Sequence, residues 1–247
     1  MNEIAQLKLK YDTSDMHGAI ASFPQQIQDS FSIFKNWNPV NPYDSIKNIL
    51  ILGMGGSAIG GDVCRVLLQN DSSIPISVNR SYNIPRWVDE TTLVIASSYS
   101  GNTEETLSAF DQCIESGALI VALTTGGKLC ELSQKYKLDH IILPSGMQPR
   151  AALGYSVSLL LLLFNKLGFC SDDIINNLKN AIDPLDLRSQ ELSVDNPKNP
   201  AVILAKQIQS YCPVIYGSED LTWVAALRFK GQLEENAKTL AFHHHIP

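Results

Sequence analysis

One segment of this chain reads Thr92-Leu93-Val94-Ile95-Ala96-Ser97-Ser98-Tyr99-Ser100-Gly101-Asn102-Thr103-Glu104-Glu105-Thr106, an apolar run followed by a turn rich in small hydroxyl residues. The β-branched run predicts a buried parallel strand, and the residues after the turn have helical spacing. Such a turn brings hydroxyls and backbone N–H groups to the positive end of a helix dipole, which suits a phosphate. A capped turn is the alternative interpretation, because Asn102 and Glu105 have the spacing of a capping box.

A second segment has the same form. Asn48-Ile49-Leu50-Ile51-Leu52 predicts a buried strand, and Gly53-Met54-Gly55-Gly56-Ser57 follows it directly. Glycines permit positive φ angles and let a ligand approach the backbone closely. In open α/β folds the carboxyl ends of parallel strands lie at one edge, where ligands bind. We therefore expect both loops to contribute to one site at that edge.

The same glycines also allow a dinucleotide-binding interpretation. Gly53, Gly55 and Ala58 fit the looser form of the G-x-G-x-x-G pattern, but Asn79 and Arg80 stand where the acidic residue that holds the ribose is expected. The pattern therefore lacks its confirming partner. The alternative interpretation is an NAD-dependent oxidoreductase. It predicts that the chain binds NAD, and a binding measurement tests it.

Composition narrows the class of protein. The chain has 247 residues, 45% of them hydrophobic and 18% charged, as in an ordinary globular protein. Its net charge of −6 argues against a general nucleic-acid surface. The apolar run Val157 to Phe164 is too short to span a bilayer and predicts a buried helix. The five cysteines have no CxxC pairing, so we expect reduced thiols in a cytoplasmic protein.

The order of expected elements predicts the fold class. Strands are expected at 48–52, 75–79, 92–97, 118–124 and 139–143, with helices at 58–69, 103–116, 128–136 and 151–167. This alternation predicts an α/β fold, a doubly wound parallel five-stranded sheet flanked by helices. We divide the chain into an N-terminal helical arm (1–42, interrupted at Pro24), a first domain with the expected phosphate-binding loops (43–170), a helix and linker (171–200) and the start of a second, incomplete domain (201–247).

The last segment is expected to hold a helix over 201–211, a short strand over 213–216 and a long helix over 222–241. These elements cannot close a sheet domain of their own, so we expect a chain that is truncated at its C-terminus. His243, His244 and His245 are predicted to end the helix. Consecutive residues on a helix point about 100° apart and would not share a metal ion, so no metal site is assigned to them.

Two further residues are candidates for chemistry. Arg150 follows the fifth strand, where it would stabilise an oxyanion or hold a phosphate. A surface ion pair in the first turn of a helix accounts for it equally well. Glu235 is a candidate general base, although charged runs on a helix are usually a solvated face.

Four elements together resemble a known family. They are Gly53-Met54-Gly55-Gly56-Ser57, the segment from Ser98 to Thr106, Gln148-Pro149-Arg150-Ala151-Ala152-Leu153-Gly154-Tyr155, and Glu235-Asn236-Ala237-Lys238. In this order they are similar to the bifunctional phosphoglucose/phosphomannose isomerases, which contain two sugar-isomerase (SIS) domains. The resemblance implies an isomerase of glucose 6-phosphate and mannose 6-phosphate to fructose 6-phosphate through an enediol.

The resemblance also implies residue roles. The substrate phosphate would be bound by a set of small residues, Gly56, Ser57, Ser98, Ser100 and Thr103. Arg150 would stabilise the enediolate, and Glu235 would move the proton between C1 and C2. No metal or redox cofactor is implied. The partners implied are a small-molecule sugar phosphate and a second copy in a homodimer with a shared active site, without nucleic acid or membrane.

The chain also departs from the family pattern. Family members continue with an Asn-His-Asn-Glu element and a later lysine, and this sequence has neither. We therefore expect impaired catalysis in this chain. The alternative is a noncatalytic sugar-phosphate-binding SIS-domain protein.

Overall fold

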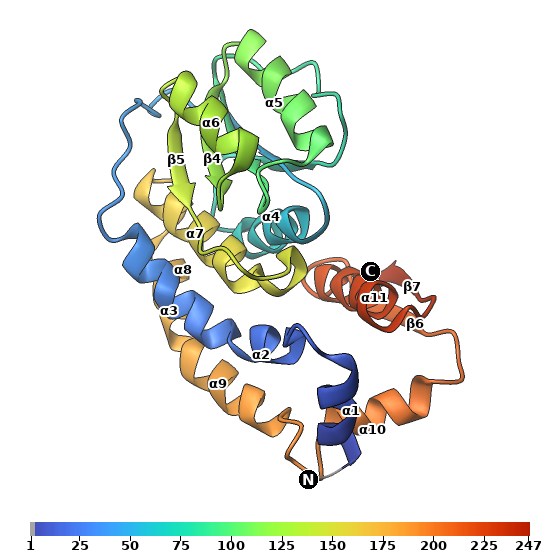
Figure 1. Cartoon of the computed structure of the whole chain (residues 1–247). Coiled ribbons are helices and arrows are strands. Elements are labelled where there is room, and N and C mark those ends of the chain that lie inside the picture. Colours follow the sequence, from blue (N-terminus) through green and yellow to red (C-terminus); the bar gives the residue numbers. More distant parts are fainter. Residues whose placement is uncertain (1–2) are drawn as a thin grey trace. The chain divides into compact units, whose positions relative to one another are not determined.

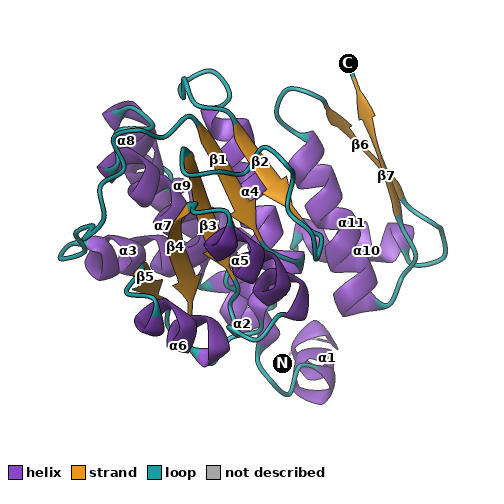
Figure 2. Cartoon of the chain, turned by 90° about the horizontal axis from the view of Figure 1, so that it is seen from above, coloured by secondary structure: helices purple, strands orange, loops and turns teal. Residues whose placement is uncertain are grey.

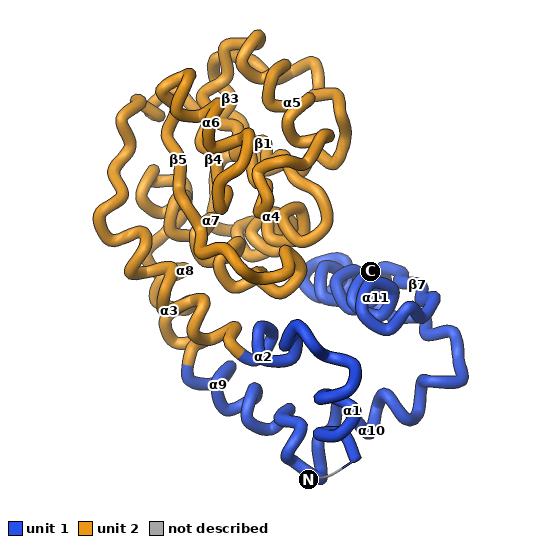
Figure 3. The backbone as a smooth tube through the Cα atoms, in the orientation of Figure 1, with its two compact units in different colours: residues 1–21, 183–247 blue, residues 22–182 orange. Residues whose placement is uncertain are grey.

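The computed structural model describes residues 3–247 and divides the chain into two compact units. One unit comprises residues 22–182, and the other comprises residues 1–21 and 183–247 (Figure 3). Residues 1 and 2, the first of the predicted arm, lie outside the described part. The helices and strands of each unit carry the labels of Figure 1.

The larger unit is built on a five-stranded parallel sheet in the order β2-β1-β3-β4-β5. The strands are β1 (Asn48–Leu52), β2 (Ile76–Asn79), β3 (Thr92–Ser97), β4 (Leu119–Thr124) and β5 (Asp139–Ile142). The predicted fold class is therefore confirmed. The strand order reverses between β1 and β3, which pair with Leu52 beside Ala96. Ligands of doubly wound folds bind at such a reversal, at the carboxyl ends of the strands.

Helices cover both faces of this sheet (Figure 2). Those of the larger unit are α3 (Phe23–Phe34), α4 (Gly55–Leu68), α5 (Glu104–Glu115), α6 (Gly127–Lys135), the short η1 (Pro149–Ala151), α7 (Leu153–Lys166) and α8 (Asp172–Asn180). Successive strand residues point to opposite faces. Ile49, Ile95 and Val121 therefore join the cluster formed with α3, α4 and α7. Leu50, Val94 and Ile120 join the cluster formed with α5 and α6.

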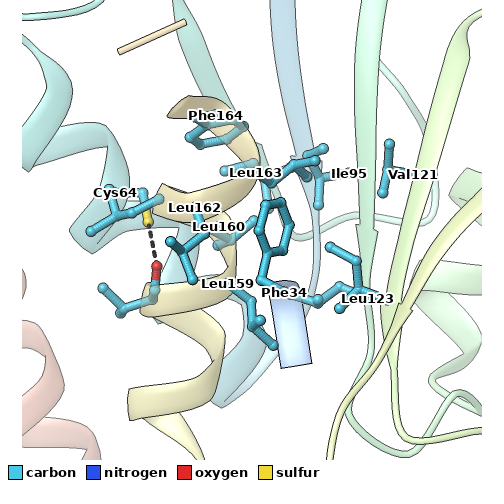
Figure 4. Close-up of a cluster of buried hydrophobic side chains, with 14 of the residues drawn as sticks. Phe34, Cys64, Ile95, Val121, Leu123, Leu159, Leu160, Leu162, Leu163 and Phe164 are labelled. Atoms are coloured by element: carbon cyan, nitrogen blue, oxygen red, sulfur yellow. Dashed lines mark hydrogen bonds between the residues drawn. The ribbon is translucent and has the colours of Figure 1, made fainter. Parts of the chain in front are cut away.

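Helix α7 lies in the middle of the first cluster, where its leucines and Phe164 contact Phe34, Ile95 and Leu123 (Figure 4). Its residues from Gly154 to Phe164 are all buried, which explains the continuous apolar run in the sequence. Among the described residues, no helix combines the length and the apolar character that crossing a bilayer requires.

The N-terminal arm is interrupted twice, once at Ser22, close to the predicted break at Pro24, and once farther upstream. Helices α1 (Glu3–Tyr11) and α2 (Met16–Ala21) are separated around Asp12, whose carboxylate accepts hydrogen bonds from the amides of Met16 and His17. Pro24 lies in the first turn of α3, where a missing N–H costs nothing. Helix α3 belongs to the sheet unit, where Phe34 joins the core cluster.

The smaller unit contains α1, α2, α9 (Ile182–Glu191) and α10 (Pro200–Ile208), followed by β6 (Val214–Ser218), α11 (Trp223–Ala237) and β7 (Phe242–Ile246). Strands β6 and β7 pair in parallel, with Tyr216 opposite His244. The prediction that His243 to His245 end a helix is wrong, because α11 stops at Ala237 and Lys238 takes a left-handed conformation with φ of 55°. Such a residue ends the helical hydrogen-bond pattern, and the histidines then extend along β6.

Candidate functional site at the carboxyl edge of the sheet

The loop after β1 leads straight into α4. The helix begins at Gly55, so Gly56 and Ser57 belong to its first turn and not to the preceding loop. Met54 is the N-cap residue, and its side chain forms no capping hydrogen bond. The first amides of α4 therefore have no side-chain oxygen from the cap position, which leaves them suited to an anion.

The loop after β3 is organised by its hydroxyls. Ser98 Oγ lies 2.9 Å from Thr103 Oγ1 and accepts a 3.1 Å hydrogen bond from the amide of Gly101. Ser100 Oγ accepts a 3.2 Å hydrogen bond from the amide of Asn102. Ser98 is buried and Ser100 is exposed, so the cluster runs from the sheet edge to the surface. These are the three hydroxyl residues that the sequence singled out in this loop.

The predicted alternative of a capping box is not what the structure shows. Thr103, not Asn102, is the N-cap residue of α5, and it makes no side-chain cap hydrogen bond. Asn102 Oδ1 instead accepts a 3.0 Å hydrogen bond from the amide of Lys128. The Thr103 hydroxyl bonds to Ser98 Oγ and not to the backbone of α5. The amides in the first turn of α5 therefore receive no hydrogen bond from the N-cap side chain and can donate to another acceptor, such as an anion.

Arg150 lies beside the first turn of α4. It is in η1, and a β-carbon added to Gly56 would lie 2.7 Å from the carbonyl oxygen of Pro149 and 3.3 Å from Arg150 Cα. Only glycine lets the two backbones approach this closely. Of the predicted site residues in this unit, Gly56 and Ser57 follow β1, and Arg150 lies in the segment after β5. Ser98, Ser100 and Thr103 follow β3, the neighbour of β1.

Gln26 fixes the segment that carries Arg150, a role that sequence analysis missed. Its side chain is 1% exposed. Its Nε2 donates to the carbonyl of Ala151 at 2.9 Å, and its Oε1 accepts from the amide of Gly154 at 3.0 Å. Nothing in the sequence pattern around Gln26 predicts a contact with a segment more than a hundred residues away. The sequence carried no signal that would have found it.

The position proposed for a dinucleotide ribose is occupied by other contacts. Asn79 Nδ2 donates to the carbonyls of Ser81 and Asn83 at 3.1 and 3.2 Å. The Arg80 guanidinium pairs with the buried carboxylate of Asp62 on α4. The end of β2 therefore presents no free carboxylate to a ribose, as the dinucleotide pattern requires.

Glu235 belongs to the other unit. It is exposed near the end of α11, and its backbone carbonyl accepts a 2.7 Å hydrogen bond from Lys238 Nζ. The neighbouring Glu234 pairs with Lys230 at 2.7 Å on the same helix. The structure thus places the predicted phosphate-binding residues and Arg150 in one compact unit and the predicted base in the second.

No metal-like cluster accompanies these residues. Within residues 3–247, no group of three or more His, Cys, Asp or Glu side chains is arranged to hold a metal ion. Of the three consecutive histidines, His245 pairs with a carboxylate, its Nδ1 lying 3.0 Å from Glu219 Oε2. The pKa of His243 is lowered, first by burial and then by the neighbouring charge of His245.

Comparisons with known proteins identify the family. The SIS domain profile matches residues 43–166, and the profile of the bacterial phospho-glucose isomerase C-terminal SIS domain matches residues 197–247. A bifunctional phosphoglucose/phosphomannose isomerase of Caldicellulosiruptor bescii is 46% identical over 229 residues, which are 92% of this chain and 67% of that protein. The chain belongs to the bifunctional phosphoglucose/phosphomannose isomerase family.

Other members of the phosphoglucose/phosphomannose isomerase family are more distant. The one from Thermoplasma acidophilum is 38% identical over 202 residues, 82% of this chain and 59% of that protein. The chain thus spans about three fifths to two thirds of the length of these relatives. The fold also matches the C-terminal domain of glucosamine-fructose-6-phosphate aminotransferase from Francisella tularensis, with a TM-score of 0.71 at 14% identity over 96% of this chain and 71% of that one.

Proposed function

We propose that this chain binds a hexose 6-phosphate at the carboxyl edge of its sheet. We further propose that the enzyme to which it belongs interconverts glucose 6-phosphate or mannose 6-phosphate with fructose 6-phosphate. The observation that carries the proposal is the arrangement of two helix N-termini without side-chain caps beside the Ser98–Thr103 hydroxyl pair. Amides and hydroxyls are the donors that a phosphate accepts.

In this proposal the phosphate is bound by Gly56, Ser57, Ser98, Ser100 and Thr103. Because the phosphate is remote from the reacting carbons, its binding energy orients C1 and C2 of the sugar. A planar guanidinium carries a permanent positive charge. Arg150, beside the first turn of α4, is therefore assigned to the oxygen that becomes negative in the enediolate.

The proposal assigns the proton transfer to Glu235. A carboxylate removes the proton from C2 of the aldose, and the electron pair forms the C1–C2 double bond of the enediolate, whose negative charge lies on O1. The hydroxyl proton of O2 passes to O1, and the carboxylate returns its proton to C1, which leaves the carbonyl of the ketose at C2. One base suffices for both steps, and the reaction changes no oxidation state of the molecule as a whole. The family relationship supports this assignment, since Glu235 lies in the segment that matches the isomerase C-terminal domain.

We also propose a partner and a cellular compartment for this chain. A second copy of the chain is proposed as partner, with an active site shared between subunits. Three of the five cysteines are buried and all are free thiols, which supports a reducing compartment such as the cytoplasm.

Calorimetric titration with 5-phosphoarabinonate, an analogue of the enediolate, tests the proposal, with NAD as the control ligand. We expect the analogue to bind and Arg150→Met to weaken it, while NAD does not bind. Glu235→Gln is expected to abolish isomerisation and spare binding. Analogue binding without turnover in the full-length enzyme would favour the noncatalytic sugar-phosphate-binding alternative. Failure of a folded protein to bind the analogue would reject the proposed site.

A further inference from the structure

Tyr99 connects three loops at the carboxyl edge of the sheet. It stands between Ser98 and Ser100, and its backbone carbonyl accepts hydrogen bonds from the amide of Thr125 at 3.1 Å and from Thr125 Oγ1 at 2.7 Å. The residue is therefore fixed at its backbone to the loop after β4. Its side chain extends in another direction, to the loop that follows β5.

The phenol holds that loop at two points. Tyr99 Oη donates a 2.8 Å hydrogen bond to the carbonyl of Pro144 and accepts a 3.1 Å hydrogen bond from the amide of Met147. A phenol hydroxyl has one O–H donor and lone pairs that accept, so it can bond to two groups at once and fix the distance between them. The two partners are three residues apart, and Arg150 follows Met147 by three more.

The Met147 side chain packs against the core, but residues 144–147 have few hydrogen bonds to hold their backbone. Pro144, Ser145 and Gly146 are exposed, and Gly146 has a positive φ of 97°. Among the hydrogen bonds of the described residues, those to the Tyr99 phenol are the ones that tie residues 144–147 to other parts of the unit. Leu143 before them is tied to Thr124, and Ala151 after them bonds within its own turn to Gln148.

We propose that Tyr99 is a positioning residue for Arg150. It holds the loop so that the guanidinium stands at the site whose phosphate end is formed by Ser98 and Ser100, the two neighbours of Tyr99 in sequence. This inference rests on the proposed function and adds a residue to it. Tyr99 acts through Arg150 and contacts no reacting atom.

The test uses Tyr99→Phe, which removes the hydroxyl and keeps the ring that packs against the core beside α7. Calorimetry with 5-phosphoarabinonate is expected to show affinity weakened about tenfold, since a small misplacement of a catalytic group has effects of this size or larger. Affinity for inorganic phosphate, followed by ³¹P line broadening, is expected to change less than about twofold. Turnover of fructose 6-phosphate by the full-length enzyme is expected to lose kcat with KM nearly unchanged.

Tyr155→Phe is the matched control. Its hydroxyl donates a partly buried 2.8 Å hydrogen bond to Asp29 Oδ2 in the same unit. That bond does not touch residues 144–147, so the ratio of analogue to phosphate affinity is expected to stay as in the wild type. A loss equal to that of Tyr99→Phe would mean that removal of any hydrogen-bonded phenol in this unit has the same effect, and it would overturn the proposal.

A double-mutant cycle isolates the path through Arg150. In an Arg150→Met background, Tyr99→Phe is expected to cause no further loss of analogue affinity. A persistent tenfold loss in that background would overturn the proposal. If the wild type binds no analogue, the proposed function fails, and amide exchange at Met147 then decides: protection unchanged in Tyr99→Phe overturns the loop-holding role, and lost protection supports it.

Discussion

Gly60 on α4 lies directly against Ser156 on α7: a β-carbon added to Gly60 would be 2.1 Å from Ser156 Oγ and 2.9 Å from Ser156 Cβ. Rotation of the hydroxyl relieves only the first of these contacts. The two helices therefore pack at a distance that a single methyl group would not permit. Because α4 begins at Gly55 and α7 follows Arg150, this contact also sets the spacing between the two helices that flank the candidate site.

Gly60→Ala is therefore expected to destabilise the protein by about 1–3 kcal/mol, the usual cost of overpacking. Gly231→Ala is the matched control, since Gly231 is also inside a helix and a β-carbon there would meet nothing within 4 Å. That variant is expected to gain roughly 0.5–1 kcal/mol from helix propensity. Urea denaturation measures both, and a neutral Gly60→Ala would show that α4 and α7 can move apart freely.

Gln26→Leu tests the side chain that fixes the segment after Arg150. The substitution keeps the volume roughly but leaves the buried carbonyl of Ala151 and the amide of Gly154 without their partner. Each orphaned group costs about 1–3 kcal/mol. Gln25→Leu serves as control because Gln25 is exposed and its side chain donates to Asp29, one turn along the same helix, so its stability change is expected within about 0.5 kcal/mol. Equal losses in the two variants, seen by thermal unfolding, would contradict the proposed role.

Ser98→Ala tests the hydroxyl cluster independently of turnover. Ser98 Oγ both pairs with Thr103 and accepts the amide of Gly101. Its removal is expected to weaken inorganic phosphate and 5-phosphoarabinonate to a similar degree, by about fivefold to tenfold. Ser108→Ala removes a hydroxyl farther along α5, bonded to the carbonyl of Tyr82, and is expected to change neither affinity. Loss of only the analogue affinity in Ser98→Ala would assign Ser98 to the sugar and not to the phosphate.

The sheet unit was largely predictable because its signals are local. β-branched runs of four to six residues are strong strand formers, and the turns after β1 and β3 carry the glycine and hydroxyl residues that are typical of tight turns. The positions of Tyr99 and Gln26 were not predictable. Their importance comes from hydrogen bonds to segments 45 or more residues away, which no periodicity encodes.

Strand β7 was predicted wrongly as the end of a helix, because its local sequence gives no strand signal. Phe242-His243-His244-His245-Ile246 has no alternation of apolar and polar residues, and three equal neighbours carry no period at all. Its conformation is decided by pairing with β6, a contact between residues nearly thirty positions apart. Strand propensity depends on such neighbours more than on the residue itself, so a prediction from local sequence extended the helix instead.

Asp139 is the buried first residue of β5. Its carboxylate accepts hydrogen bonds from the amides of Val40 and Asn41, from Asn41 Nδ2 and from the hydroxyl of Tyr43 at 2.7 Å. In Asp139→Asn the side-chain NH2 group faces groups that themselves donate hydrogen bonds. We therefore expect the free energy of unfolding, measured by urea denaturation, to fall by about 3 kcal/mol or more. Asp111→Asn, at an exposed position of α5, is expected to be nearly neutral.

Tyr43 gives this prediction a second readout. Burial, and then the bond to Asp139, raises the pKa of its phenol above the usual 10.0. A phenol whose folded pKa is raised contributes stability that is present below about pH 10 and is lost as the pH rises further. Absorbance at alkaline pH is therefore expected to show Tyr43 ionising at lower pH in Asp139→Asn than in the wild type. An unchanged titration together with unchanged stability would mean that the four donors find other acceptors and that Asp139 does not anchor residues 40–43.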